Sequence, residues 1–170
     1  MIEMKELSKQ FGDIQALHQV SATIQKGSIF GLIGSNGAGK STLFNAIAGS
    51  FYVDDGFIEL DGEDITALSI TERARRGISY AFQQPVRFKG LTVKDLITLA
   101  AGRPIGVPEA CAYLSEVGLC AKDYIDRELD ASLSGGEVKR IEIAMIMARA
   151  TKLSLFDERR PASTCGPSPT

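Results

Sequence analysis

The sequence contains few of the residues that most often build metal sites and disulfide frameworks. It has one histidine, His18, and three widely separated cysteines, Cys111, Cys120 and Cys165. The cysteine spacing matches no metal-ligand pattern, and an odd number argues against a disulfide framework. We therefore expect a protein of the reducing cytoplasm, in which His18 is an ordinary surface or strand residue.

Long apolar runs and an excess of positive charge are also lacking. No run approaches the roughly 20 residues that span a bilayer. The first residues, MIEMKELSKQ, lack the basic and then apolar plan of a secretory signal. The net charge of -2 gives no electrostatic reason to expect nucleic acid as a partner. These absences favour a cytoplasmic protein that does not bind nucleic acid.

The pattern that is present alternates strands with helices, which indicates an α/β domain with helices packed on a sheet. The length of 170 residues suits one domain with a sizeable core. The expected strands are 1–12, 17–24, 28–34, 57–60, 78–82 and 153–156. The expected helices are 40–48, 71–76, 92–101, 108–117 and 134–150, the last beginning with a capping box of Ser134 and Glu137.

A glycine-rich segment follows the expected buried strand 28–34 and precedes a helix. It fits the pattern G-x-x-x-x-G-K-[ST] and comprises Gly34, Ser35, Asn36, Gly37, Ala38, Gly39, Lys40, Ser41 and then Thr42. Glycines let backbone N–H groups wrap around phosphates, and the helix adds its positive N-terminal end. Lys40 would bind the β- and γ-phosphates, and the Ser41 hydroxyl would bind Mg²⁺. The alternative is a glycine-rich turn that only begins a helix.

Two acids, Asp157 and Glu158, end the apolar strand 153–156. Such a pair can hold magnesium with its first member and act as a base with its second. The alternative is a solvated strand end. Together with the phosphate loop, the pair predicts ATP and Mg²⁺ as ligands.

Leu133 to Glu137 spell LSGGE between these two motifs. With this segment, the chain from its start to Glu158 resembles the nucleotide-binding domain of ABC ATPases. The resemblance implies a P-loop NTPase fold of the ABC type, in the α/β class. It has a mostly parallel sheet, an antiparallel β subdomain at the N-terminal side and a helical subdomain that carries the signature LSGGE. We expect this fold to be incomplete at the C-terminal end.

The resemblance also assigns roles to individual residues. Phe11 would stack on adenine, Gln83 would contact Mg²⁺ and the attacking water, Glu158 would be the general base, and Ser134, Gly135 and Gly136 would contact the γ-phosphate of ATP held by another copy. The catalytic residues are then Glu158, Gln83 and Lys40, and the metal ligands are Ser41, Gln83 and Asp157. An ordinary polar strand end is the alternative for Gln83. The implied partner is a second nucleotide-binding domain in a head-to-tail dimer.

The segments GGEVKRIEIA and AFQQPVRFKGLTV resemble the SufC branch, the ATPase of iron–sulfur cluster assembly. This branch implies a SufB- or SufD-like scaffold as partner. One alternative is the ATP-binding subunit of an ABC membrane transporter, which would be peripheral to the membrane and bind a transmembrane subunit. A second alternative is a fragment that binds ATP without hydrolysing it.

Residues 159–170, RRPASTCGPSPT, follow no period and depart from the family pattern. The resemblance implies Pro after Glu158, as in the SufC-like version DEPEAGIDLWSFSN. With suitable codon choice, deleting one base from that proline's codon shifts the reading frame. The shifted frame translates to this chain's sequence at every position from Glu158 to Thr170. We therefore hypothesise a domain of residues 1–158 and a frameshifted tail, 159–170. A genuine disordered tail is the alternative.

The resemblance further implies that a later strand of the chain lies between the acidic strand and the strand before the phosphate loop. Without it, Ile29 to Ile33 and Leu153 to Phe156 would each have an unpaired edge. Prolines 161, 167 and 169 prevent the tail from filling this place, since proline lacks the ladder donor. We expect residues 1–170 to be poorly stable and impaired in hydrolysis.

Overall fold

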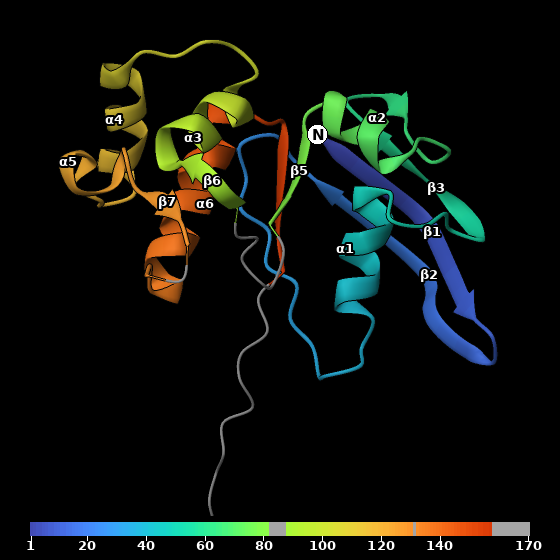
Figure 1. Ribbon diagram of the computed structural model, residues 1–170. Helices are drawn as coiled ribbons and strands as arrows, with labels where there is room; N and C mark the ends of the chain where they lie inside the picture. The colour runs from blue at the N-terminus through green and yellow to red at the C-terminus, as the bar shows by residue number, and fades with distance from the viewer. Residues whose placement is uncertain (82–87, 131, 158–170) are drawn as a thin grey trace, which may run out of the picture.

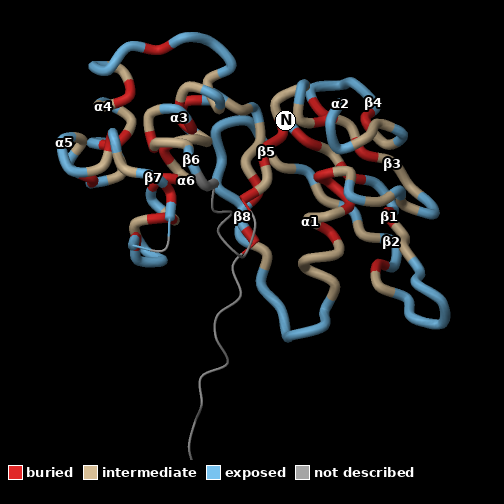
Figure 2. Tube along the Cα trace, viewed as in Figure 1, coloured by how far each residue is buried: buried red, intermediate tan, exposed pale blue. Residues whose placement is uncertain are grey.

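The computed structural model of the chain describes residues 1–81, 88–130 and 132–157 (Figure 1). Its elements form two parts, one built on strands and one built mainly on helices. Buried residues gather separately in each part (Figure 2). Gln83, Glu158 and the tail 159–170 lie outside the described residues, so the roles and the domain boundary expected for them stay predictions.

An antiparallel sheet forms the outer layer of the strand-based part. It comprises β1 (Ile2–Phe11), β2 (Ile14–Ile24), β3 (Asp55–Leu60) and β4 (Glu63–Asp64) in the order β2-β1-β3-β4. Alternation along β1 buries Ile2 and Met4 on one face of the sheet. His18 is exposed in β2, as predicted.

Helix α1 (Lys40–Ala48) packs its apolar side into the same core. Leu43, Ile47 and Ala48 are buried, as their helical spacing predicts. The helix ends at Gly49, whose φ of 84° lies in the left-handed region that a C-terminal cap requires.

A parallel strand pair, β5 (Ile78–Ala81) and β8 (Leu153–Phe156), lies between the two parts (Figure 1). Its register pairs Ile78 with Leu153 and Ala81 with Phe156. Because the two strands are parallel, their C-terminal ends lie at the same end of the pair. Asp157, which follows β8, therefore lies at the end of the pair where β5 also ends.

Helix α2 (Ile70–Arg75) precedes β5 and connects the two parts. Its carbonyl at Ala74 accepts a hydrogen bond of 2.8 Å from Nη2 of Arg149, the last residue of α6. The carbonyl of Gly77, just beyond α2, accepts the N–H groups of Lys152 and Leu153 at 2.8 and 3.1 Å. The end of α6 and the start of β8 are thus tied to the α2–β5 junction.

The helical part contains α3 (Val93–Ala101), α4 (Val107–Glu116), α5 (Ala121–Tyr124) and α6 (Gly135–Arg149), with the short strands β6 (Phe88–Thr92) and β7 (Glu128–Leu129). Leu96, Leu114 and Ile141 are fully buried at its centre. In the described part of the chain, no helix has the length and apolar character needed to cross a membrane.

The strand expected at 28–34 is absent, and that prediction was wrong. Residues 28–34 belong to no strand, and Ile29 and Ile33 are 102% and 96% exposed. A strand forms only when a neighbour accepts its backbone hydrogen bonds. Within the described ranges, β8 is paired with β5 alone, so the segment 28–34 finds no strand partner there. Among the described residues, the parallel sheet accordingly has two strands.

Candidate functional site

The glycine-rich segment Gly34 to Gly39 forms a loop directly before α1, as the sequence predicts. Gly37 and Gly39 have φ angles of 83° and 82°. These left-handed conformations turn the backbone sharply, and a side chain would strain them. The N–H of Ala38 closes the loop by donating to the carbonyl of Ser35 at 3.3 Å. The loop itself is exposed to solvent from Gly34 to Ala38.

Gly39 is required for a steric reason as well. A Cβ at this position would lie 2.5 Å from the carbonyl oxygen of Ala16 in β2. The loop can therefore approach the antiparallel sheet only with glycine here, and this contact fixes the point where α1 begins. The first turn of α1 contains no acidic residue that would compete for its free N–H groups. The helix end and loop together suit an anion such as a phosphate.

Lys40, the first residue of α1, bends back over the loop. Its Nζ donates to the carbonyl oxygens of Gly34 and Ser35 at 2.7 and 2.6 Å. The ammonium is thus held against the first two residues of the loop. A phosphate there could replace these neutral carbonyl acceptors with anionic oxygens, which bind an ammonium more strongly.

Phe11 ends β1 with a ring that is 47% exposed. It packs against Phe51, which follows α1, with ring centroids 5.3 Å apart and planes at 87°. The ammonium of Lys9 lies 5.5 Å from the Phe11 ring centroid and 5.7 Å from that of Phe51. Lys9 also forms an ion pair of 2.6 Å with Asp54. An accessible, oriented aromatic ring is what stacking on a base requires.

Asp157 is a buried carboxylate, 6% exposed, at the end of β8. The hydroxyl of Tyr80 in β5 donates to its Oδ2 at 3.3 Å. Burial, with the nearby Asp157 charge and this hydrogen bond, raises the pKa of Tyr80 to about 12. Tyr80 therefore stays a neutral donor that orients the carboxylate. Among the described residues, no group of three or more His, Cys, Asp and Glu side chains is placed to hold a metal ion. The magnesium site of Ser41, Gln83 and Asp157 stays a prediction.

The LSGGE segment forms the start of α6, and the predicted capping box is present. The Ser134 side chain accepts from the N–H of Glu137 at 3.3 Å, and Oε2 of Glu137 accepts from the N–H of Ser134 at 2.7 Å. The Ser134 and Tyr124 hydrogen bonds lower the pKa of Glu137 to about 2. Gly135 and Gly136 are exposed, with open space where a side chain would extend. In the described part of the chain, nothing therefore covers the N-terminus of this helix.

The two glycine-containing sites lie on different parts of the molecule. Gly34 to Thr42 lies beside the antiparallel sheet, whereas Ser134 to Gly136 begins α6 in the helical part (Figure 1). The structure thus brings Phe11, the loop and Lys40 into the strand-based part and leaves the signature separate from them.

Three further residues near these sites were not predicted from the sequence. Phe51 packs on Phe11, Tyr80 binds Asp157, and Arg73 of α2 binds the end of α1. The alternation in ISYAF could have placed Tyr80 on the face of Asp157. The run of Arg73, Arg75 and Arg76 offers no signal for which arginine is buried.

These features are a glycine-rich loop at a helix N-terminus, an acidic strand end and a separate capped helix. The family model described as ABC transporter matches residues 17–160. The chain therefore belongs to the ABC transporter family, and its fold is that of the ABC ATPases, with an antiparallel N-terminal β subdomain.

Known relatives agree with this assignment. The chain is 37% identical over 166 residues to an uncharacterized ABC transporter ATP-binding protein of Methanocaldococcus jannaschii, covering 93% of this chain and 66% of that protein. It is 35% identical over 164 residues to the lipopolysaccharide export system ATP-binding protein of Haemophilus influenzae, covering 93% and 67%. The chain thus spans about two thirds of the length of these relatives.

A solved structure provides the comparison in three dimensions. It is the dimeric, post-hydrolysis state of an ATP-binding cassette bound to ADP and Pi. It superposes with a TM-score of 0.76 at 25% identity, covering 92% of this chain and 73% of that one.

Proposed function

We propose that this chain is the ATP-binding and ATP-hydrolysing subunit of an ABC-type transport system. The observation that carries the proposal is the loop Gly34 to Gly39 together with Lys40, the first residue of α1. Its left-handed glycines, close contact with Ala16 and inward lysine form a phosphate cradle at the start of α1. Such a cradle fits the phosphates of a nucleotide better than a structural turn, which needs neither the lysine nor the free N–H groups.

In this proposal each described residue has a definite task. N–H groups of the loop and of Ser41 and Thr42 bind the phosphates, Lys40 neutralises their charge, and Phe11 stacks on the adenine. The hydroxyl of Ser41 and the carboxylate of Asp157 are the hard oxygen donors that Mg²⁺ prefers. Mg²⁺, when bound, would stabilise the charge on the phosphates during transfer.

Gln83 and Glu158 complete the proposed machinery. Gln83 would bind the metal ion and orient the attacking water. Glu158, as general base, would accept a proton from that water. Ser134, Gly135 and Gly136 would bind the γ-phosphate held by a second copy in a head-to-tail dimer. The exposed start of α6, remote from the chain's own loop, supports a role toward another molecule.

The transporter interpretation is favoured over the SufC-like one. The relatives described above are named as ABC transporter or export-system ATP-binding proteins. No finding supports iron–sulfur cluster assembly, which was the interpretation preferred from the sequence. The proposed partner is then a transmembrane transporter subunit, with this chain peripheral to the membrane, in place of a SufB- or SufD-like scaffold.

We also propose that residues 1–170 alone hydrolyse ATP slowly. The segment 28–34 leads into the loop but is exposed and belongs to no strand. Within the described ranges, no sheet therefore fixes the start of the phosphate cradle. Loss of positioning at a reacting centre lowers rates steeply.

Replacing Lys40 tests the nucleotide site. Lys40→Ala removes charge-assisted hydrogen bonds to phosphate, so we expect ATP binding to weaken by about 1.5–3 kcal/mol in calorimetry. The matched control is Lys26→Ala, which removes the same charge from an exposed turn outside the loop. Equal ATP affinity in the two folded variants would contradict the proposal.

A further inference from the structure

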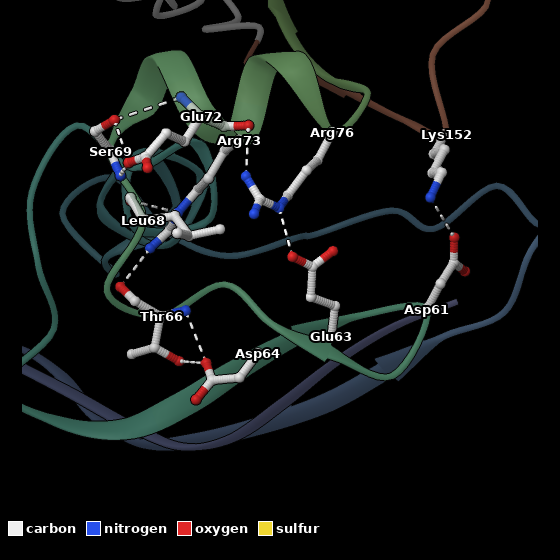
Figure 3. Close-up of polar contacts among 10 residues, drawn as sticks. All are labelled: Asp61, Glu63, Asp64, Thr66, Leu68, Ser69, Glu72, Arg73, Arg76 and Lys152. Atoms are coloured by element: carbon white, nitrogen blue, oxygen red, sulfur yellow. Dashed lines mark hydrogen bonds and ion pairs between the residues drawn. The ribbon is translucent and has the colours of Figure 1, made fainter.

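Arg73 in α2 has the most deeply buried charge of the described residues, with 1% of its surface exposed. Its guanidinium donates to four backbone carbonyl oxygens. Nη1 binds Ala46 and Ile47 at 2.6 and 2.9 Å, Nη2 binds Thr66 at 2.7 Å, and Nε binds Leu68 at 3.0 Å. Figure 3 shows the side chain reaching the Thr66 and Leu68 segment.

Burying this charge is unfavourable unless its donors are satisfied. Burial lowers the pKa of the Arg73 guanidinium, which the Tyr52 and Asp64 side chains partly oppose. An apolar side chain of similar size would avoid this cost in a core. The arginine is therefore needed for more than filling the core, and its four carbonyl acceptors indicate what it holds in place.

Two of these acceptors belong to the last turn of α1. The last four carbonyls of a helix lack partners within it, and they carry the negative end of the helix dipole. Helix α1 has no basic residue in its own last turn. Arg73 supplies the missing cation from α2 and binds Ala46 and Ile47 directly.

Gly49 makes this contact possible. A Cβ at Gly49 would lie 3.0 Å from Cδ and 3.1 Å from Nε of Arg73, and its φ of 84° would itself strain another residue. The absence of a side chain at Gly49 thus lets Arg73 pass to the carbonyls of α1.

The helix that carries Arg73, α2, is itself held in place by hydrogen bonds and an ion pair. Ser69 and Glu72 form a capping box at the start of α2, with an N–H to carboxylate bond of 2.9 Å. Arg76 binds Glu63 at 2.6 Å, and Thr66 binds Asp64 at 2.5 Å through its hydroxyl (Figure 3). The segment that holds Arg73 is therefore braced against β4.

We propose that Arg73 is a positioning residue of the nucleotide site. It fixes the C-terminal end of α1 against α2, and so sets the direction of the helix whose other end carries the phosphate loop. At about 1.5 Å per residue, α1 is only about 13 Å long, so a tilt at one end displaces the other. The inference rests on the proposed function, because it assumes that the loop binds nucleotide.

The test compares nucleotide affinity with stability. We expect Arg73→Met to bind ATP about tenfold or more weakly, since displacing the loop disrupts its charge-assisted hydrogen bonds to phosphate. The matched control is Leu114→Ala, which destabilises the separate helical core without contacting α1. Affinity is measured by calorimetry at a temperature where circular dichroism shows both variants folded. Lower stability with unchanged ATP affinity in Arg73→Met would make Arg73 merely structural and overturn the proposal.

Two further measurements keep the proposal testable if Arg73→Met does not fold. Arg73→Lys keeps the charge but loses the fork that reaches four carbonyls, and it should also bind ATP more weakly. In the unaltered chain, ATP should slow amide exchange at Gly49 and Ser50, at the far end of α1. Protection confined to residues 34–42 would contradict the proposal, whereas no ATP binding by the unaltered chain would instead refute the proposed function.

Discussion

The ring of Phe11 meets the ring of Phe51 edge-on, at a centroid distance of 5.3 Å and an interplanar angle of 87°. Such pairs add about 0.5–1.5 kcal/mol beyond the apolar area they bury. The Lys9 ammonium lies near both rings, and its ion pair with Asp54 holds it there. Phe51 therefore restricts how the exposed ring of Phe11 is oriented at the end of β1.

This geometry predicts a loss of binding affinity that affects ATP, which has an adenine base, and spares ligands without one. Phe11→Ala should weaken ATP binding by about 1–3 kcal/mol, the usual value of a base–aromatic stack. Phe51→Leu should weaken it in the same direction by less. Tripolyphosphate, which has no base, should bind both variants like the unaltered chain in calorimetry. Equal losses for ATP and tripolyphosphate would show that Phe11 acts on the loop and not on the base.

The capping box of α6 predicts two separable effects of Ser134→Ala. Loss of the cap should reduce the free energy of unfolding by about 0.5–2 kcal/mol. It should also weaken ATP-dependent dimerisation, measured by analytical ultracentrifugation in a Glu158→Gln background that suppresses turnover. Thr92→Ala is the matched control, because Thr92 caps α3 with the same kind of box and lies away from the nucleotide site. If both variants dimerise equally, Ser134 is a helix cap and nothing more.

The ionisation of Glu137 predicts a pH dependence of stability. Its hydrogen bonds to Ser134 and Tyr124 lower its pKa from 4.5 to about 2 in the folded chain. A carboxyl group with a depressed pKa stabilises the folded state above its unfolded pKa, and the contribution is lost as pH falls through the folded value. The free energy of unfolding should therefore decline between about pH 5 and pH 2.

Glu137→Gln should flatten that decline in urea titrations at pH 6, 4 and 3. Glu116→Gln, at the exposed end of α4, is the control substitution and should keep the slope of the unaltered chain. Identical slopes in all three proteins would show that Glu137 does not contribute to the acid sensitivity.

The tail hypothesis predicts a missing base near codon 159. Restoring it should open a frame with Pro-Glu-Ala-Gly-Ile-Asp after Glu158. The restored chain should melt at a higher temperature and hydrolyse ATP faster than residues 1–170, because a further strand could then pair with 28–34. A genomic sequence with no such frame would end the frameshift hypothesis. Matching melts and turnover would show that the lone β5–β8 pair is sufficient.

The sequence predicted best those features that depend on nearby residues. Ser134 and Glu137 form their capping box because both partners lie within one turn, and Gly49 ends α1 for a local reason. The helix expected at 108–117 is found at Val107–Glu116. In each case the residues that decide the structure are close together in the chain.

Features that depend on distant partners were missed. Strands β6 and β7 exist because Phe88 pairs with Leu129, far along the chain, and both strands are too short for a visible period. The apolar run 28–34 has the composition of a buried strand, yet it lacks a described neighbour. Arg73 looks like its exposed neighbours until the fold brings Ala46 and Ile47 to it.

The exposed run 28–34 also has a consequence for solubility. Ile29, Phe30 and Ile33 present 102%, 55% and 96% of their surfaces to water. A short apolar segment of high β-propensity, free of charge and proline, is the kind that assembles with identical segments of other molecules. As an isolated polypeptide, residues 1–170 would thus tend to aggregate as the protein concentration rises. A single lysine substituted within 29–33 would act as a gatekeeper that reduces this aggregation.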